Sequence, residues 1–329
     1  MTRAHRFLSA SGFALLGLGL SGAPLSGQSP SEASATPVAN EAAKLTFTPA
    51  KPAIGSLVRL TIRRSNRPGD SLASVSGRMT GEPLHFEADS SGELWAFGLI
   101  PLEGSDSVVA RVTLAYASGA ADTLRLAVPY PHRPAPAQVA AGRRRLKVSS
   151  VFTAPPDSLT QLRIAREAQQ ARALGTQAHD TPRLWTEPFL RPRASRITSR
   201  FGAGRLFNGR LTSSHAGVDF AGQPGEVVRA ANRGIVALVA SFFLAGNVVY
   251  IDHGAGVVTG YFHLTQATVA AGDTVQRGQQ IGLVGATGRV TGPHLHWSAR
   301  YGQQTFDPMG LVELTAKPAS KPARPAARR

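Results

Sequence analysis

Apolar and polar residues alternate with a period of two in the first part of the chain, in short runs separated by turn residues. In Leu57–Ile62, for example, Val58, Leu60 and Ile62 occupy every second position. This period puts alternate side chains on opposite faces of a β-strand, and short runs of it are typical of immunoglobulin-like sandwiches. We expect such a sandwich over residues 44–130, with strands at 45–48, 57–62, 75–79, 84–87, 94–100, 108–116 and 123–128.

A second region of short apolar runs, bounded by glycines, extends over residues 196–314. Neighbouring runs of this kind, joined by tight turns, indicate an antiparallel sheet. The chain as a whole is therefore expected to be all-β with two domains. Strands of the second domain are expected at residues 227–230, 234–240, 247–252, 257–263 and 280–285.

The pattern changes to a helical one in the connecting segment, residues 131–195. A helix is expected over 157–174, with Asp157 or Ser158 as its N-cap and Gly175 ending it. Residues 146–152 are a further strand candidate. The expected apolar stripe of the helix consists of Leu159, Leu162, Ala165 and Leu174.

The two ends of the chain are unlike the domains. Arg3 and Arg6 precede an apolar run over residues 7–20, which predicts a secretory signal peptide over 1–27, with an uncleaved membrane anchor as the alternative. Residues 28–43 are expected to be a disordered linker, and 315–329 a basic disordered tail. We therefore expect an exported protein of the periplasm or cell envelope.

The formal net charge is +16, from 36 basic and 20 acidic residues, which favours contact with anionic polymers. Nothing resembles a nucleic-acid-binding module, and a signal peptide argues against a nucleic-acid partner. The basic tail is expected either to contact an anionic wall or membrane surface or simply to keep the chain soluble. The sequence does not indicate an oligomeric state.

Candidate chemistry concentrates in three short motifs. His215 and Asp219 lie four residues apart, His294 and His296 lie two apart, and His263 lies between the two pairs. A catalytic zinc takes three ligands from His and Asp or Glu side chains, and the chain has no cysteine to form a thiolate site. Residues two apart share one face of a strand, so one histidine of the 294–296 pair can bind metal while the other contacts water or substrate.

These motifs and their surroundings resemble the lysostaphin/LytM-type zinc endopeptidases, the M23 peptidase family. The resemblance covers roughly residues 196–311 and includes Ser199–Gly202, His215–Asp219, Ile251–Gly254, Tyr261–Leu264 and Thr287–His296. It implies a duplicated-hybrid-motif-like antiparallel sheet that forms the floor of a groove. The groove walls would be loops at residues 202–214, 242–246 and 285–293.

The resemblance also implies the roles of the five site residues. His215, Asp219 and His296 would bind Zn²⁺, and His263 and His294 would be catalytic, with either one as the base. The implied function is hydrolysis of peptide cross-links in bacterial peptidoglycan by metal-activated water, with its peptide stems as the partner. The bond is either D-Ala–diaminopimelate or a glycine bridge. The alternative is a non-catalytic wall-binding protein or an activator of another wall hydrolase.

For four further residues, a role at the site is weighed against a structural role. Asn208 and Thr291 would contact substrate or brace the site, and His253 is expected to be structural. His179 is a candidate fourth ligand that would hold the metal in a latent form, but a structural role is favoured for the segment that contains it.

Overall fold

The computed structural model describes residues 43–63, 69–103, 106–131, 144–152, 154–207 and 210–316. The expected signal peptide or anchor, nearly all of the 28–43 linker, the tail from 317 onward and Asn208 lie outside these residues. Within the described ranges, no helix combines the length and the apolar character needed to cross a bilayer. The predicted domain bounds stay predictions.

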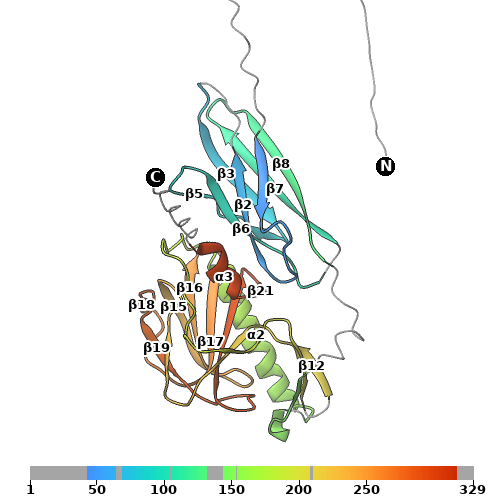
Figure 1. The fold of residues 1–329 in the computed structure, drawn as a ribbon, viewed down its shortest axis with the longest axis vertical. Coiled ribbons are helices and arrows are strands. Elements are labelled where there is room, and N and C mark those ends of the chain that lie inside the picture. The colour runs from blue at the N-terminus through green and yellow to red at the C-terminus, as the bar shows by residue number, and fades with distance from the viewer. Residues whose placement is uncertain are drawn as a thin grey trace, which may run out of the picture. The chain divides into compact units, whose positions relative to one another are not determined.

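Two four-stranded sheets make up the N-terminal β region (Figure 1). Apolar side chains from both sheets pack into one buried cluster that includes Leu60 and Ile62 from one sheet and Val112 and Leu114 from the other. This is a β-sandwich, and its immunoglobulin-like character stays a prediction. One sheet has the order β1 (Lys44–Thr48), β2 (Leu57–Arg63), β6 (Leu94–Leu99), β5 (Glu87–Ala88), and the other β4 (Glu82–Pro83), β3 (Leu72–Met79), β7 (Ser107–Tyr116), β8 (Ala121–Pro129).

The prediction of a strand over residues 84–87 is mostly wrong, because within this range only Glu87 lies in a strand. The chain here passes from β4 in one sheet to β5 in the other, so residues 84–86 lie outside both sheets. Leu84 still buries its side chain, which is why its surroundings show the apolar pattern of a strand.

The connecting segment contains the short strand β9 (Arg144–Leu146), a 3-10 turn (Ser150–Phe152) and the helix α2 (Ser158–Gln177). The strand candidate at residues 146–152 is therefore mostly wrong. Asp157 caps α2 as expected, since its Oδ1 accepts a hydrogen bond from the Thr160 amide at 2.8 Å.

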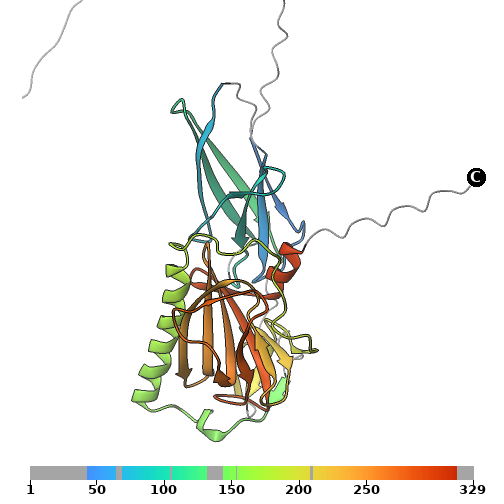
Figure 2. The same cartoon turned by 90° about the vertical axis from the view of Figure 1, so that its left-hand side faces the viewer.

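The predicted end of α2 is wrong, and of its predicted apolar stripe only Leu174 packs against a buried cluster. Leu159 and Leu162 are 79% and 65% exposed, whereas Ala171 and Gly175 are buried. The helix continues past Gly175 to Gln177. Gly175 lies against the backbone of Gly302, where a Cβ would come within 1.8 Å of the Gly302 carbonyl oxygen, so glycine serves here for close packing and not as a helix end. Figure 2 shows α2 lying along the strands of the large sheet, and this contact requires a residue without a side chain.

Gly175→Ala is expected to destabilise the protein by about 1–3 kcal/mol, because the new methyl group overlaps the Gly302 carbonyl. Gly310→Ala is the matched control, since a Cβ there meets nothing closer than Leu57 at 3.7 Å and alanine favours a helix. Urea unfolding of both variants measures the difference. Equal stabilities would contradict the close helix contact.

The second β region contains a ten-stranded sheet with the order β10-β13-β20-β17-β16-β15-β18, joined by β14, β19 and β21. Each pairing in it is antiparallel, as expected. The strands are β10 (Ile197–Ser199), β13 (Val218–Ala221), β14 (Val227–Arg229), β15 (Gly234–Phe242), β16 (Gly246–Gly254), β17 (Val257–Ala267), β18 (Thr274–Val275), β19 (Gln280–Val284), β20 (His294–Tyr301) and β21 (Gln304–Phe306).

A small three-stranded sheet stands beside the large one. Its strands β11 (Gly204–Phe207) and β12 (Arg210–Ser214) form a hairpin, and β9 pairs parallel with β11. The segment 202–214, expected to be a loop, is therefore mostly a hairpin. A helix not expected from the sequence, α3 (Met309–Thr315), follows β21.

Candidate metal centre and active site

Three neighbouring strands, β13, β20 and β17, bring the five candidate residues together. Asp219 on β13 pairs with His296 on β20, and His296 in turn pairs with Phe262, the residue before His263 on β17. His294 lies two residues before His296 on β20, so both side chains emerge on one face. His215 lies just ahead of β13.

The three predicted metal ligands form a tight triangle of donor atoms. His215 Nε2, Asp219 Oδ1 and His296 Nδ1 lie 2.9 Å from one another in every pair. The three residues are only 2%, 6% and 6% exposed. Within the described residues this is the one group of at least three acidic, histidine or cysteine side chains arranged to hold a metal. Two imidazole nitrogens and one carboxylate oxygen with no thiolate suit zinc, which needs three such ligands and an open position.

Neighbouring groups orient these ligands. His215 Nδ1 lies 2.8 Å from the Arg200 carbonyl and must donate to it, which leaves the Nε2 lone pair facing the triangle. Asp219 Oδ2, the oxygen outside the triangle, accepts a hydrogen bond from Arg205 at 2.5 Å. The Phe262 ring stacks on His296 with centroids 5.1 Å apart. Such outer partners fix the orientation of metal ligands.

The ionisation of the ligands also suits a metal. Burial raises the pKa of Asp219, but its close contacts with the His215 and His296 imidazoles outweigh burial and hold that pKa well below its usual range. Burial lowers the pKa of His296 to about 4, in spite of Asp219. At neutral pH the carboxylate is therefore ionised and the His296 imidazole neutral, which are the forms that bind metal.

His263 and His294 lie side by side next to the triangle, with ring centroids 4.9 Å apart. Each Nδ1 donates a hydrogen bond of 2.8 Å to a backbone carbonyl, of Thr287 for His263 and of Gly292 for His294. With the proton on Nδ1, Nε2 is the ring nitrogen left to act as an acceptor, and His294 Nε2 lies 3.6 Å from Asp219 Oδ1. Burial, with His294 and His296 nearby, holds the pKa of His263 well below its usual value.

The backbone at His263 is unusual, with a φ of +62° in the left-handed region that favours glycine. A β-bulge turns the chain here, and the His263 amide donates to the Ala245 carbonyl at 2.9 Å instead of to a neighbouring strand. Non-glycine residues in this conformation cluster at functional sites, because the strain persists only where the surroundings enforce it.

Thr287 is a site residue whose role the sequence reasoning missed. Its carbonyl accepts the hydrogen bond from His263 Nδ1. Its Oγ1 accepts from the Asn247 amide and donates to the Leu264 carbonyl, both at 2.9 Å. The Thr287–Gly288 motif gave its position, but only the fold shows what it contacts. Arg205, the partner of Asp219, carried no sequence signal beyond its charge.

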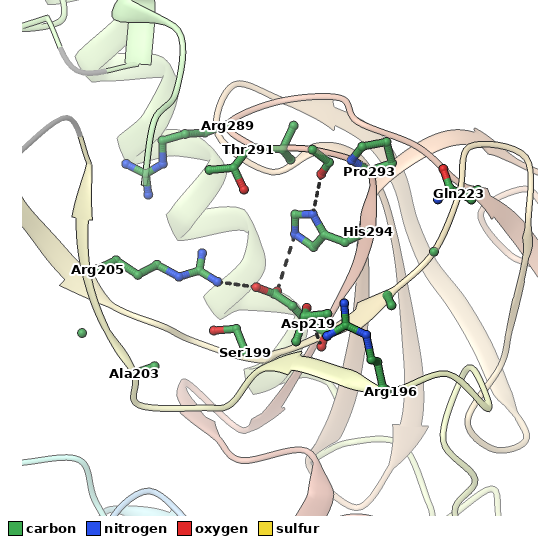
Figure 3. A pocket seen from close by; sticks show the side chains of 16 residues that line it. Arg196, Ser199, Ala203, Arg205, Asp219, Gln223, Arg289, Thr291, Pro293 and His294 are labelled. Atoms are coloured by element: carbon green, nitrogen blue, oxygen red, sulfur yellow. Dashed lines mark hydrogen bonds and ion pairs between the residues drawn. The ribbon is translucent and has the colours of Figure 1, made fainter. Parts of the chain in front are cut away.

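A cavity of about 320 Å³ opens beside the triangle (Figure 3). Asp219 and His294 lie on its floor, and Thr291, which was expected to contact substrate or brace the site, lines it. Its walls come from the β11 region and from the 289–293 turn; residues 242–246, expected as a third wall, are not among its lining residues.

The two remaining histidine candidates lie elsewhere. His253 is fully buried and hydrogen-bonded to the Arg233 carbonyl and to Thr259, both at 2.8 Å, as expected for a structural residue. His179 contacts His85 at 2.8 Å and Glu82 at 3.0 Å, so it is not a fourth ligand in this structure.

Comparison with known proteins agrees with this geometry. The model of peptidase family M23 matches residues 213–308, a range that contains all five residues of the site. Residues 213–308 are thus the segment of this chain that is similar to M23 peptidases, and this segment is called the M23 domain below. The resemblance that the motifs indicated is thereby confirmed for this part of the chain.

Relatives of the M23 domain are named as cell-wall enzymes. This chain is 45% identical over 103 residues to peptidoglycan DD-endopeptidase ShyA of Vibrio cholerae, covering 31% of this chain and 24% of ShyA. It is 41% identical over 121 residues to DD-carboxypeptidase/endopeptidase Mpg of Neisseria meningitidis, covering 36% of this chain and 27% of Mpg. The matches thus span about a quarter of the length of these relatives.

A solved structure has a fold similar to that of this chain. A structure described as an M23 peptidase from Pseudomonas aeruginosa superposes with a TM-score of 0.59 at 24% identity, covering 80% of this chain and 95% of that one. At this identity the likeness shows the fold alone. The matched share exceeds the M23 domain, so the two structures also share parts outside it.

Proposed function

We propose that this protein is a zinc-dependent endopeptidase that hydrolyses peptide cross-links of bacterial peptidoglycan. One observation carries the proposal. A buried triangle of His215, Asp219 and His296 donor atoms lies beside a histidine pair whose Nε2 atoms are the acceptors, and Asp219 and His294 of this group line one cavity. The DD-endopeptidase names of the relatives support peptidoglycan as the substrate.

In this proposal His215, Asp219 and His296 hold the zinc. When bound, the metal supplies a Lewis acid for the peptide carbonyl and lowers the pKa of a water molecule. Arg205 and the Arg200 carbonyl hold the ligand side chains in the orientation that binding requires.

His263 and His294 supply the proton transfers. The hydrogen bonds to Thr287 and Gly292 keep the proton on each Nδ1, so either Nε2 can take a proton from the attacking water. The other ring, after its Nε2 takes up a proton from solvent, can donate a hydrogen bond to the oxygen that becomes negative when the carbonyl is attacked. Because both rings have the same tautomer, either of them can serve as the base.

The D-Ala–diaminopimelate cross-link is the proposed bond, in line with the DD-endopeptidase names of the relatives. We further propose export to the periplasm or cell envelope, which the sequence pattern of residues 1–27 supports. The immunoglobulin-like domain at 44–130 would position the M23 domain, and the basic tail at 315–329 would contact an anionic surface.

Digestion of purified sacculi tests the function. Protein lacking residues 1–27 and loaded with zinc is expected to convert cross-linked muropeptides into monomers, and chelation followed by zinc addition should remove and restore that activity. Mass spectrometry of the products identifies the bond that was cut. Zinc-loaded protein that binds sacculi and leaves every cross-link intact would overturn the proposal in favour of a wall-binding or activating protein.

A further inference from the structure

The cavity beside the proposed zinc site carries a concentration of positive charge that catalysis at the metal does not require. Three arginines line it, Arg196, Arg205 and Arg289, and Asp219 is the one carboxylate among its lining residues. That carboxylate is already occupied, because Oδ1 belongs to the ligand triangle and Oδ2 accepts from Arg205. The cavity therefore has an excess of cations even before a divalent metal binds.

Two of these arginines come from different walls and extend toward the same end of the cavity. Arg205 extends from the β11 hairpin, and Arg289 extends from the turn before β20. Figure 3 shows their guanidinium groups at the same end, with Arg196 on the other side of Asp219.

The position of Arg289 is fixed by the backbone of the site. Its amide donates to the Leu244 carbonyl at 2.9 Å, and it lies two residues after Thr287, which holds His263. The side chain is half-buried, and both this burial and the charge of Arg205 lower its pKa. Two guanidinium groups that repel each other in one cavity would gain stability from an anion placed between them.

The two peptide bonds considered for the substrate differ in whether a free carboxylate lies next to the bond that is cut. In a D-Ala–diaminopimelate cross-link, the carbon attached to the scissile amide nitrogen also carries a free carboxylate. A glycine bridge has no carboxylate at that place. A guanidinium group binds a carboxylate through paired, charge-assisted hydrogen bonds, so this group is one that the cavity can recognise.

We propose that Arg289, with Arg205 beside it, forms a carboxylate-binding subsite that selects cross-links with a free carboxylate next to the scissile amide. The inference rests on the proposed endopeptidase function and adds the residue that determines its specificity. Arg289 is the residue to test, because Arg205 also contacts the metal ligand Asp219.

A matched pair of substrates tests the subsite without changing the protein. The two are D-Ala–diaminopimelate cross-linked dimers that differ only in the carboxylate beside the scissile amide, which is free in one and a carboxamide in the other. Wild-type, zinc-loaded protein is expected to cleave the acid with a kcat/KM about 10- to 100-fold higher than the amide. Equal values for the two dimers would overturn the proposal.

Substitution of Arg289 then assigns the effect to this residue. Arg289→Gln is expected to lower kcat/KM for the acid by the same factor and to leave the amide unchanged, and Arg289→Lys should restore part of the preference. Arg229→Gln, on the exposed strand position of β14, is the control and should keep the full preference. Equal losses on both dimers in Arg289→Gln would contradict a specificity role.

Failure of the subsite and failure of the function give different results. If wild-type protein cleaves neither dimer, the endopeptidase proposal fails, and calorimetric binding of the two dimers to wild-type and Arg289→Gln protein still tests the subsite. Tighter binding of the acid that disappears in Arg289→Gln would support it. Equal binding of both dimers to wild-type protein would overturn it.

Discussion

Replacement of His296 with alanine is expected to abolish zinc binding and, with it, hydrolysis of cross-links. The Nδ1 of His296 lies 2.9 Å from both Asp219 Oδ1 and His215 Nε2, so it forms one corner of the donor triangle. Two remaining ligands cannot provide the three-ligand site of a catalytic zinc. Since loss of an outer partner alone costs about 10- to 100-fold in metal affinity, loss of a ligand should exceed that range. Metal content after dialysis measures the change.

His294→Ala is the matched control for this experiment. It removes the same kind of side chain two positions away on β20, but its Nε2 lies 3.6 Å from Asp219 and outside the triangle. We expect this variant to retain about one zinc per chain while losing turnover. A His296→Ala protein that keeps its zinc, or a His294→Ala protein that loses it, would contradict the ligand assignment.

Much of the fold follows from local patterns in the sequence. The alternation of Val58, Leu60 and Ile62 predicted β2, because a strand buries every second side chain on one face. The Asp157 cap predicted the start of α2 for an equally local reason, since its carboxylate binds an amide three residues away. The H-x-H motif brought His294 and His296 to one face by the same period of two.

Features that depend on distant contacts were missed or wrong. Glycine is typical of a helix end, but Gly175 lies inside the helix, where the absence of a side chain allows the carbonyl of Gly302, far along the chain, to lie against it. Leu159 and Leu162 fit an apolar stripe by spacing, yet the face that is buried lies around Ala171 and Gly175. Spacing within a helix defines a stripe but does not say which stripe another element covers.

The candidate site shows the same division. The residue types of the proposed ligands were visible in the motifs, because zinc chemistry limits which side chains can serve. The contact of Arg205 with Asp219 was not visible, since it depends on where a hairpin places a side chain 14 residues away. The role of Thr287 was hidden for a further reason, because the group that orients His263 is a backbone carbonyl, which every residue has.

His263 provides the sharpest test of the proposed chemistry, because its backbone is shaped around its side chain. Its φ of +62° is costly for histidine, whereas glycine adopts it freely. A histidine kept in this strained backbone conformation indicates that its imidazole is needed at the site. If only the bulge mattered, glycine would serve better at this position.

We expect His263→Ala and His263→Gly to retain zinc and to lower kcat on cross-linked dimers by about 10²- to 10⁴-fold, the range for a lost acid–base group. The glycine variant separates the side chain from the backbone, because it keeps the bulge without strain and lacks only the imidazole. Single-turnover hydrolysis alongside metal analysis measures both properties. Near wild-type turnover in His263→Gly would show that the position serves the bulge alone, and His294 would then be left as the single histidine able to move the proton.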